Sequence, residues 1–294
     1  MQKDYINGAY GALPAEFAAY ATAQIAILPI PYDGTSTWQK GADQGPAALL
    51  AASANMELYD LETNSEVFRQ GIVTMPPVAC PVEPEQMIAA VTDFTTSILA
   101  DQKFVVGLGG EHSITIGLVK AMHQFYPHLS VLQLDAHSDL RPEYEHSPFN
   151  HACVMARVRE ICPIVQVGIR SMDSSELPYL EPERVVFAHE FPLNQQQLTK
   201  ILNHLTDHVY VTIDLDVFDP AYMPSTGTPE PGGLDWYAVM HILNGLVKNK
   251  KVIGFDVNEL LPNPQNKAPD FLAAKLVYRF LSMIFMQEVN HAKE

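Results

Sequence analysis

The chain has 294 residues, of which 47% are hydrophobic, and it carries 34 Asp and Glu against 18 Lys and Arg, for a formal net charge of −16. This composition excludes a disordered chain, and the acidic surface argues against binding to nucleic acid or to anionic membranes. The apolar runs are too short to span a membrane, and the first residues do not resemble a signal peptide. Three cysteines without Cys-x-x-Cys spacing favour a reducing compartment, so a cytoplasmic protein is predicted.

Short apolar segments of strand type alternate with helical patterns along the chain. The predicted strands are 24–31, 103–107, 131–134, 164–168, 185–188, 208–213 and 252–257. The predicted helices are 47–58, 85–98, 113–126, 151–161, 195–205, 236–246 and 270–286. This alternation predicts βαβ units, which form a single parallel sheet with helices on both faces. No shift in composition marks a domain boundary, so residues 1–294 are expected to form one domain.

Three potential metal ligands follow the predicted strand 131–134, namely Asp135, His137 and Asp139. Side chains two residues apart on an extended chain point to the same face, so these three project together if the extended conformation persists. Ionised groups are costly to bury unless they are paired or bound to a metal. A polar strand end followed by a turn would equally account for an isolated Asp-x-His-x-Asp motif.

The same kind of residue recurs after three other predicted strands. Asp214 and Asp216 follow strand 208–213, and Glu259 follows strand 252–257. Two glycines after strand 103–107 allow a sharp turn, which aims His112 into the same space. Ligands bind beyond the carboxyl ends of the strands in sheets of this kind. The recurrence therefore favours a metal site over a chance arrangement of turns.

Six of these residues are candidate ligands, which are too many for one tetrahedral zinc ion: the carboxylates Asp135, Asp139, Asp214 and Asp216 and the imidazoles His112 and His137. They suit two cations about 3.5–4 Å apart with bridging carboxylates. Oxygen-rich ligation with some imidazole favours Mn²⁺ over Zn²⁺, with Ni²⁺ or Co²⁺ also compatible. Two cations sharing a water molecule lower its pKa, so hydrolysis of an electron-poor carbon or phosphorus is predicted.

Three motifs taken together resemble those of the ureohydrolase family of arginases and agmatinases, and agmatinases most closely. They are Gly109-Gly110-Glu111-His112, Asp135-Ala136-His137-Ser138-Asp139 and Asp214-Leu215-Asp216-Val217-Phe218-Asp219-Pro220. The similarity runs from about Ile27 to Pro262. It implies a three-layer αβα fold with a single central parallel sheet, two Mn²⁺ ions per subunit, and assembly into homotrimers or homohexamers.

The resemblance also implies how the ligands are shared. One ion would be held by His112, Asp135, Asp139 and Asp214, and the other by Asp135, His137, Asp214 and Asp216. Asp135 and Asp214 would bridge the two ions. By the same resemblance, hydroxide attacks the guanidinium carbon, a tetrahedral intermediate collapses, and Asp139 relays a proton to the departing amine.

Two further positions match catalytic residues of the family. His151 matches a loop histidine that shuttles protons between solvent and the site, although His146 competes for this role on sequence grounds alone. Glu259 matches the carboxylate that orients the guanidinium. Glu111 precedes a candidate ligand and is expected to support it rather than to react. Asn258, which precedes Glu259, stands where relatives often carry an apolar residue.

The substrate implied by the resemblance is a small cationic guanidino compound. Agmatine, cleaved to putrescine and urea as in polyamine biosynthesis, is favoured by two loops. Arg141 stands where arginases place an asparagine that holds a carboxylate, and Glu230 stands where they place an apolar residue. The alternatives are a guanidinobutyrase, a guanidinase, an arginase, or a metal-binding relative without catalysis. His151 and Glu259 argue against the last of these, because a non-catalytic relative needs neither.

Overall fold

The computed structural model of the chain describes residues 8–192 and 195–291. Its centre is one eight-stranded sheet in the order β2-β1-β3-β8-β7-β4-β5-β6, and every pairing in it is parallel. The strands are β1 (Ile25–Ile30), β2 (Ile72–Thr74), β3 (Phe104–Gly109), β4 (Leu129–Leu134), β5 (Ile164–Ile169), β6 (Val185–Phe187), β7 (His208–Asp214) and β8 (Lys251–Asn258). The predicted single parallel sheet is confirmed.

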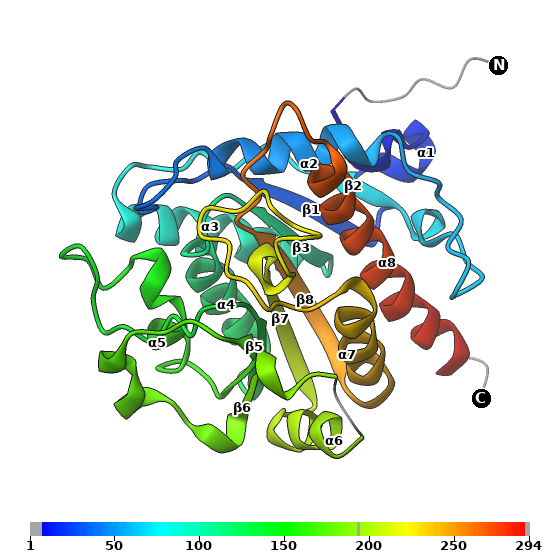
Figure 1. Cartoon of the computed structure of the whole chain (residues 1–294). Coiled ribbons are helices and arrows are strands. Elements are labelled where there is room, and N and C mark those ends of the chain that lie inside the picture. Colours follow the sequence, from blue (N-terminus) through cyan, green and yellow to red (C-terminus); the bar gives the residue numbers. More distant parts are fainter. Residues whose placement is uncertain (1–7, 193–194, 292–294) are drawn as a thin grey trace.

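Helices cover both faces of this sheet and make the fold three-layered (Figure 1). They are α1 (Ala15–Ala18), α2 (Gly45–Ser53), α3 (Pro84–Ala100), α4 (Ile114–Phe125), α5 (Val154–Val158), α6 (Gln195–His204), α7 (Trp236–Asn249) and α8 (Ala268–His291). Helices α2, α6, α7 and α8 pack on one face, whereas α3, α4 and α5 pack on the other. Within the described ranges, none of these helices has the length and apolar character needed to cross a bilayer.

The strands are largely apolar because both of their faces are buried. In β1, Ile25 and Ile27 join the core beneath α2 and α8, whereas Ala26, Leu28 and Ile30 join the core beneath α3 and α4. Successive side chains of a strand point to opposite faces, so a strand covered on both sides has to be a continuous apolar run. This is why the central strands could be located from the sequence.

Several elements differ from the predictions, among them the short helix α1, which was not predicted. The short edge strand β2 (Ile72–Thr74) was not predicted, because three residues are too few to establish a period-two pattern. The helix predicted over 47–58 ends at Ser53. The helix predicted over 151–161 begins as a 3₁₀ turn, where the Asn150 side chain accepts a hydrogen bond from the amide of Ala152 at 3.1 Å, and only Val154–Val158 is α-helical.

The turn that follows β3 requires glycine. A Cβ atom at Gly110 would lie 2.0 Å from the carbonyl oxygen of Tyr32, and one at Gly109 would lie 1.9 Å from Oδ1 of Asn258. No other residue allows the backbone such close approach. The two glycines therefore let β3 end against β1 and β8 and bring the next residues, Glu111 and His112, over the sheet edge.

A buried ion pair anchors α8. Arg279 pairs with Asp60, both of them buried, and with the more exposed Glu62. Breaking a buried pair leaves an uncompensated charge and typically costs about 3–5 kcal/mol. We therefore expect Arg279→Ala to lower the free energy of unfolding in urea by about that amount. Arg69→Ala, which removes an exposed pair with Glu66, should cost less than about 1 kcal/mol. Equal unfolding midpoints for the two variants would contradict this role of Arg279.

Candidate active site

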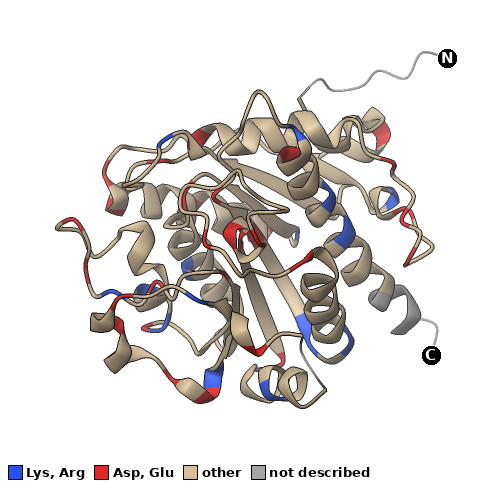
Figure 2. Cartoon of the chain, viewed as in Figure 1, with Lys and Arg blue, Asp and Glu red and all other residues tan. Residues whose placement is uncertain are grey.

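Four neighbouring strands in the middle of the sheet deliver the predicted residues to one place. His112 follows β3, Asp135 follows β4, Asp214 ends β7 and Glu259 follows β8. Segments of the ribbon coloured red for Asp and Glu gather at the centre of the view in Figure 2, where these strands end. Because parallel strands present all their carboxyl ends at one edge, residues distant in sequence converge there.

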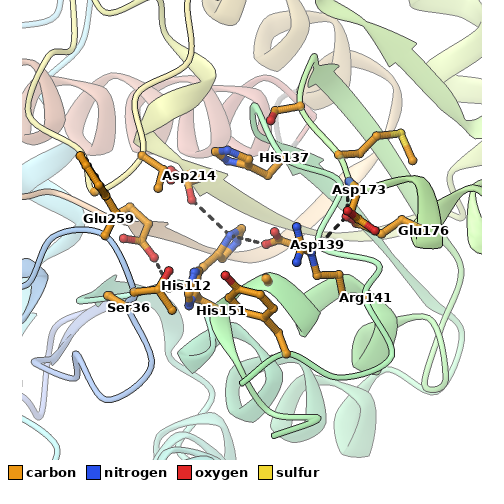
Figure 3. A pocket seen from close by; sticks show the side chains of 18 of the residues that line it. Ser36, His112, His137, Asp139, Arg141, His151, Asp173, Glu176, Asp214 and Glu259 are labelled. Atoms are coloured by element: carbon orange, nitrogen blue, oxygen red, sulfur yellow. Dashed lines mark hydrogen bonds and ion pairs between the residues drawn. The ribbon is translucent and has the colours of Figure 1, made fainter. Parts of the chain in front are cut away.

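The first group of candidate ligands surrounds the imidazole of His112. Its Nδ1 atom lies 3.2 Å from Oδ2 of Asp135, 3.3 Å from Oδ2 of Asp139 and 3.4 Å from Oδ2 of Asp214. Figure 3 shows the ring directed between the side chains of Asp139 and Asp214. All four residues are buried. Three carboxylates thus converge on one nitrogen atom.

The second group surrounds the imidazole of His137. Its Nδ1 atom lies 2.8 Å from Oδ2 of Asp216 and 3.7 Å from Oδ1 of Asp135. Asp135 therefore belongs to both groups, with one carboxylate oxygen facing each histidine. Asp214 is less tightly placed: it approaches His112, while its Oδ1 accepts a hydrogen bond from the amide of Asp216 at 2.9 Å.

The local charge balance is unfavourable for the protein alone. Burial and the neighbouring charges of Asp216 and Asp135 raise the pKa of Asp214 well above its usual range. Burial and the charge of Asp135 raise the pKa of Asp139 to about 7. Burial also opposes ionisation of Asp135, but the neighbouring His112 and His137 outweigh it and lower its pKa. The crowded carboxylates need more positive charge than two imidazoles supply.

These residues fit a pair of metal cations. The Nδ1 atom of His112 is buried and has no hydrogen-bond partner in the part of the chain that the structure describes. An orphaned imidazole nitrogen facing three carboxylates is the arrangement expected of a ligand, because a buried polar atom otherwise pairs. The mixture of carboxylates and imidazoles suits Mn²⁺, with Ni²⁺ or Co²⁺ as other matches.

Two site residues have left-handed backbones. The φ angle is 52° at Asp139 and 66° at Glu259, a conformation that is uncommon outside glycine and is found at functional sites. The extended conformation after β4 therefore does not persist to Asp139, and this corrects the simple period-two expectation. Asp139 reaches His112 because the chain turns there, and not because it continues the strand.

His151 lies at the cavity beside these groups, whereas His146 is exposed and does not line it. The hydroxyl of Thr35 accepts a hydrogen bond from the His151 amide at 2.9 Å and lies 3.3 Å from its Nδ1 atom. The same hydroxyl donates to Glu111 at 2.8 Å. Burial, with smaller contributions from His137 and His112, lowers the pKa of His151 to about 4, so the ring is neutral near pH 7.

Glu259 faces the cavity from the side of β8 (Figure 3). Its Oε1 atom accepts a hydrogen bond from the amide of His112 at 2.8 Å, and its own amide donates to the carbonyl of Gly110 at 2.7 Å. Burial and the charges of Asp214 and Glu111 raise the pKa of Glu259 well above its usual range. A cation bound against this carboxylate would relieve that cost.

The cavity has a volume of about 280 Å³, and Arg141 contributes to its wall. The Nε atom of Arg141 lies 3.5 Å from Oε1 of Glu176, and its guanidinium lies over the ring of Tyr144, 4.5 Å from the ring centre. Glu230 lies beside the site: its Oε1 atom is 3.9 Å from Nε2 of His137, and its side chain is 36% exposed. Exposed Asp173 also lines the cavity.

The sequence of the chain matches a known protein family. The model described as "Arginase family" matches residues 23–283, which is most of the chain. The chain belongs to the arginase family. The resemblance read from the three sequence motifs is thereby confirmed.

Three relatives in this family show how near the chain lies to agmatinases. It is 38% identical over 274 residues to the N(1)-aminopropylagmatine ureohydrolase of Synechocystis sp., with 90% of each chain covered. It is 35% identical to the agmatinase of Pyrococcus horikoshii, over 89% of this chain and 92% of that one. The agmatine ureohydrolase of Thermoplasma volcanium superposes with a TM-score of 0.83 at 29% identity, over 93% of this chain and 94% of that one. The chain is therefore a ureohydrolase, an enzyme that hydrolyses amidino C–N bonds.

Sequence reasoning missed several residues that shape this ureohydrolase site. Thr35 stands in a polar loop that gave no specific signal. Glu176 is buried, and its Oε2 atom accepts hydrogen bonds from the Ser138 hydroxyl and from the Leu140 amide, so it holds the loop of the first aspartate motif. Asp256 could have been noticed in the sequence, because a carboxylate in the middle of an apolar strand has to be paired.

Proposed function

We propose that this ureohydrolase hydrolyses agmatine to putrescine and urea in the cytoplasm, with two Mn²⁺ ions per subunit. The observation that carries the proposal is the charge of the cavity wall. Apart from Asp139 and Asp214, which are candidate metal ligands, the described residues of the wall include three carboxylates and one guanidinium group: Asp173, Glu176 and Glu259 against Arg141. Such a wall attracts a substrate that is cationic at both ends and repels one that carries a carboxylate.

The state of Arg141 supports agmatine over arginine. A free guanidinium in this position would be a natural partner for the α-carboxylate of arginine. Arg141 is instead engaged by Glu176 and lies over Tyr144. Its charge is therefore already balanced within the protein, and the α-carboxylate of arginine would be repelled by Glu176 beside it.

The proposed roles of the other residues follow from where they lie. Bound manganese would supply nucleophilic hydroxide at neutral pH. Glu259, fixed by the amide of His112, binds the guanidinium and orients its carbon toward the aspartates. His151 is neutral and borders the cavity, so it accepts and returns protons between solvent and the site. Asp139, which lines the cavity beside His112, carries a proton to the departing amine.

Steady-state kinetics on several guanidino compounds test the substrate. We expect kcat/KM for agmatine to exceed that for arginine, and that for guanidinobutyrate, by roughly 10²-fold or more. The reason is that placing a substrate carboxylate beside the carboxylates of the cavity wall costs several kcal/mol of binding free energy. Urea release is measured with the manganese-loaded protein. Higher kcat/KM for either anionic-tailed compound would reject agmatine and leave the ureohydrolase assignment unaffected.

N(1)-aminopropylagmatine is a second candidate substrate. The relative from Synechocystis is named for it, and Asp173 offers an exposed carboxylate in the cavity wall that suits a further ammonium group. Hydrogen bonds from Ser175 lower the pKa of Asp173, so this carboxylate is charged at neutral pH. The same assay decides between the candidates: a preference for the longer compound that Asp173→Asn abolishes would replace agmatine as the substrate.

The proposal includes one domain per chain and assembly into a homotrimer or homohexamer. The support for assembly is the family resemblance. Size-exclusion chromatography with light scattering measures the mass directly. A monomer that retains full activity would reject this part of the proposal.

A further inference from the structure

A buried polar network lies behind His112, on the side away from the cavity. The Nε2 atom of His112 lies 2.8 Å from the hydroxyl of Thr212, and that hydroxyl donates to Oδ1 of Asp256 at 2.6 Å. The hydroxyl of Tyr210 donates to Oδ2 of Asp256 at 2.6 Å, and that of Thr115 donates to the same oxygen at 3.1 Å. These five residues are buried, and Asp256 is not one of the candidate ligands.

The direction of each hydrogen bond in this network follows from the carboxylate. An ionised carboxylate only accepts, and a hydroxyl has a single proton to donate. Because Thr212 gives its proton to Asp256, its oxygen must accept from His112. The proton of the neutral imidazole then resides on Nε2, which leaves the lone pair on Nδ1. That atom is the one that faces Asp135, Asp139 and Asp214.

We propose that Asp256 is a positioning residue, which acts through Thr212 to fix the tautomer and the orientation of His112 for metal binding. The inference rests on the metal pair of the proposed function, but not on its substrate. Ligating histidines generally donate their other ring N–H to such a partner, and loss of that partner typically lowers metal affinity about 10–100-fold. In this protein His112 contacts the hydroxyl of Thr212, which in turn donates to Asp256.

Asn258, the residue that departs from the usual apolar pattern, belongs to the same network. Its Nδ2 atom donates to Oδ1 of Asp256 at 2.6 Å and also lies 3.4 Å from the Thr212 hydroxyl. The pKa of Asp256 is raised because burial outweighs the nearby His112 and the hydrogen bonds from Thr212, Tyr210 and Asn258, all of which lower it. Asn258 therefore adds a donor that favours the ionised carboxylate on which the bond directions depend.

Titration of the metal-free protein with Mn²⁺ tests this inference, with unbound Mn²⁺ measured by electron paramagnetic resonance. We expect Thr212→Val to raise the dissociation constant of one of the two ions about 10–100-fold and to leave the other unchanged. Thr212→Ser keeps the hydroxyl and should bind both ions like the wild type. Asp256→Asn should behave like Thr212→Val, because an amide can donate to Thr212 and turn its proton toward His112.

Tyr210→Phe is the matched control, since it removes another hydrogen bond to Asp256 and leaves the link to His112 intact. It should retain both affinities. Wild-type binding by Thr212→Val and Asp256→Asn would overturn the inference. So would equal weakening by Thr212→Ser and Tyr210→Phe, which would indicate general damage to a buried network. If Thr212→Val does not fold, Asp256→Asn and its control decide. A protein that shows these shifts but releases no urea would reject the proposed function alone.

Discussion

Asp135→Ala is expected to remove both metal ions, because each oxygen of this carboxylate faces one of the two histidines. Metal content should fall from about two Mn²⁺ ions per chain to well below one, and kcat should fall at least roughly 10³-fold, since the ions supply several kcal/mol of transition-state stabilisation. Elemental analysis of the purified variant, together with urea release, measures both effects. His112→Ala, by comparison, should weaken mainly one site.

Asp219→Ala provides a control from the same stretch of chain as Asp214. Its carboxylate accepts hydrogen bonds from the amides of Ala221, Gly232 and Gly233 and so shapes a loop. This variant should keep its metal. A single tightly bound ion in the fully active wild type would refute the binuclear assignment, whatever the variants do.

His151→Ala should lower kcat by about 10²–10⁴-fold, the range typical of general acid–base catalysis, while metal content stays at the wild-type level. The reason is that His151 borders the cavity but approaches Thr35 and Tyr144 instead of the candidate ligands. Removing it takes away a proton carrier and leaves the aspartates in place. Turnover and elemental analysis on the same sample separate the two effects, and added imidazole should restore part of the rate.

His146→Ala is the matched control, because His146 lies in the same loop but is exposed. The His146→Ala variant should keep kcat and metal content near the wild-type values. The opposite pattern would reverse the assignment of the proton shuttle. In that pattern kcat falls strongly in His146→Ala and stays at the wild-type value in His151→Ala. Loss of metal in His151→Ala would instead show that the residue supports the metal site.

The strands and their ends were predictable because one physical rule governs both. A strand buried on both faces is a continuous apolar run, so the boundary of β7 at Asp214 is visible as an abrupt change in polarity. Parallel strands bring such boundaries to one edge, which placed His112, Asp135 and Asp214 together without knowledge of the sheet order. Assignment of separate roles required the family resemblance.

The residues that were missed depend on contacts between distant segments. Thr35 meets His151 across 116 positions, and Glu176 holds Ser138 and Leu140 from another loop. No local pattern encodes such a pairing. The turn at Asp139 was missed for a different reason, because a left-handed aspartate depends on its surroundings and not on its own preference.

The position of β8 has a consequence for how the protein is made. It is the last strand in the chain, but it inserts between β3 and β7 in the middle of the sheet. Without β8, the strands of a nascent chain that ends before residue 251 fall into two separate groups, β2-β1-β3 and β7-β4-β5-β6, with no strand to join them. His112 belongs to one half, and the aspartates belong to the other. Insertion of β8 both closes the sheet and delivers Glu259, so the catalytic machinery is completed only when the last strand of the sheet has folded.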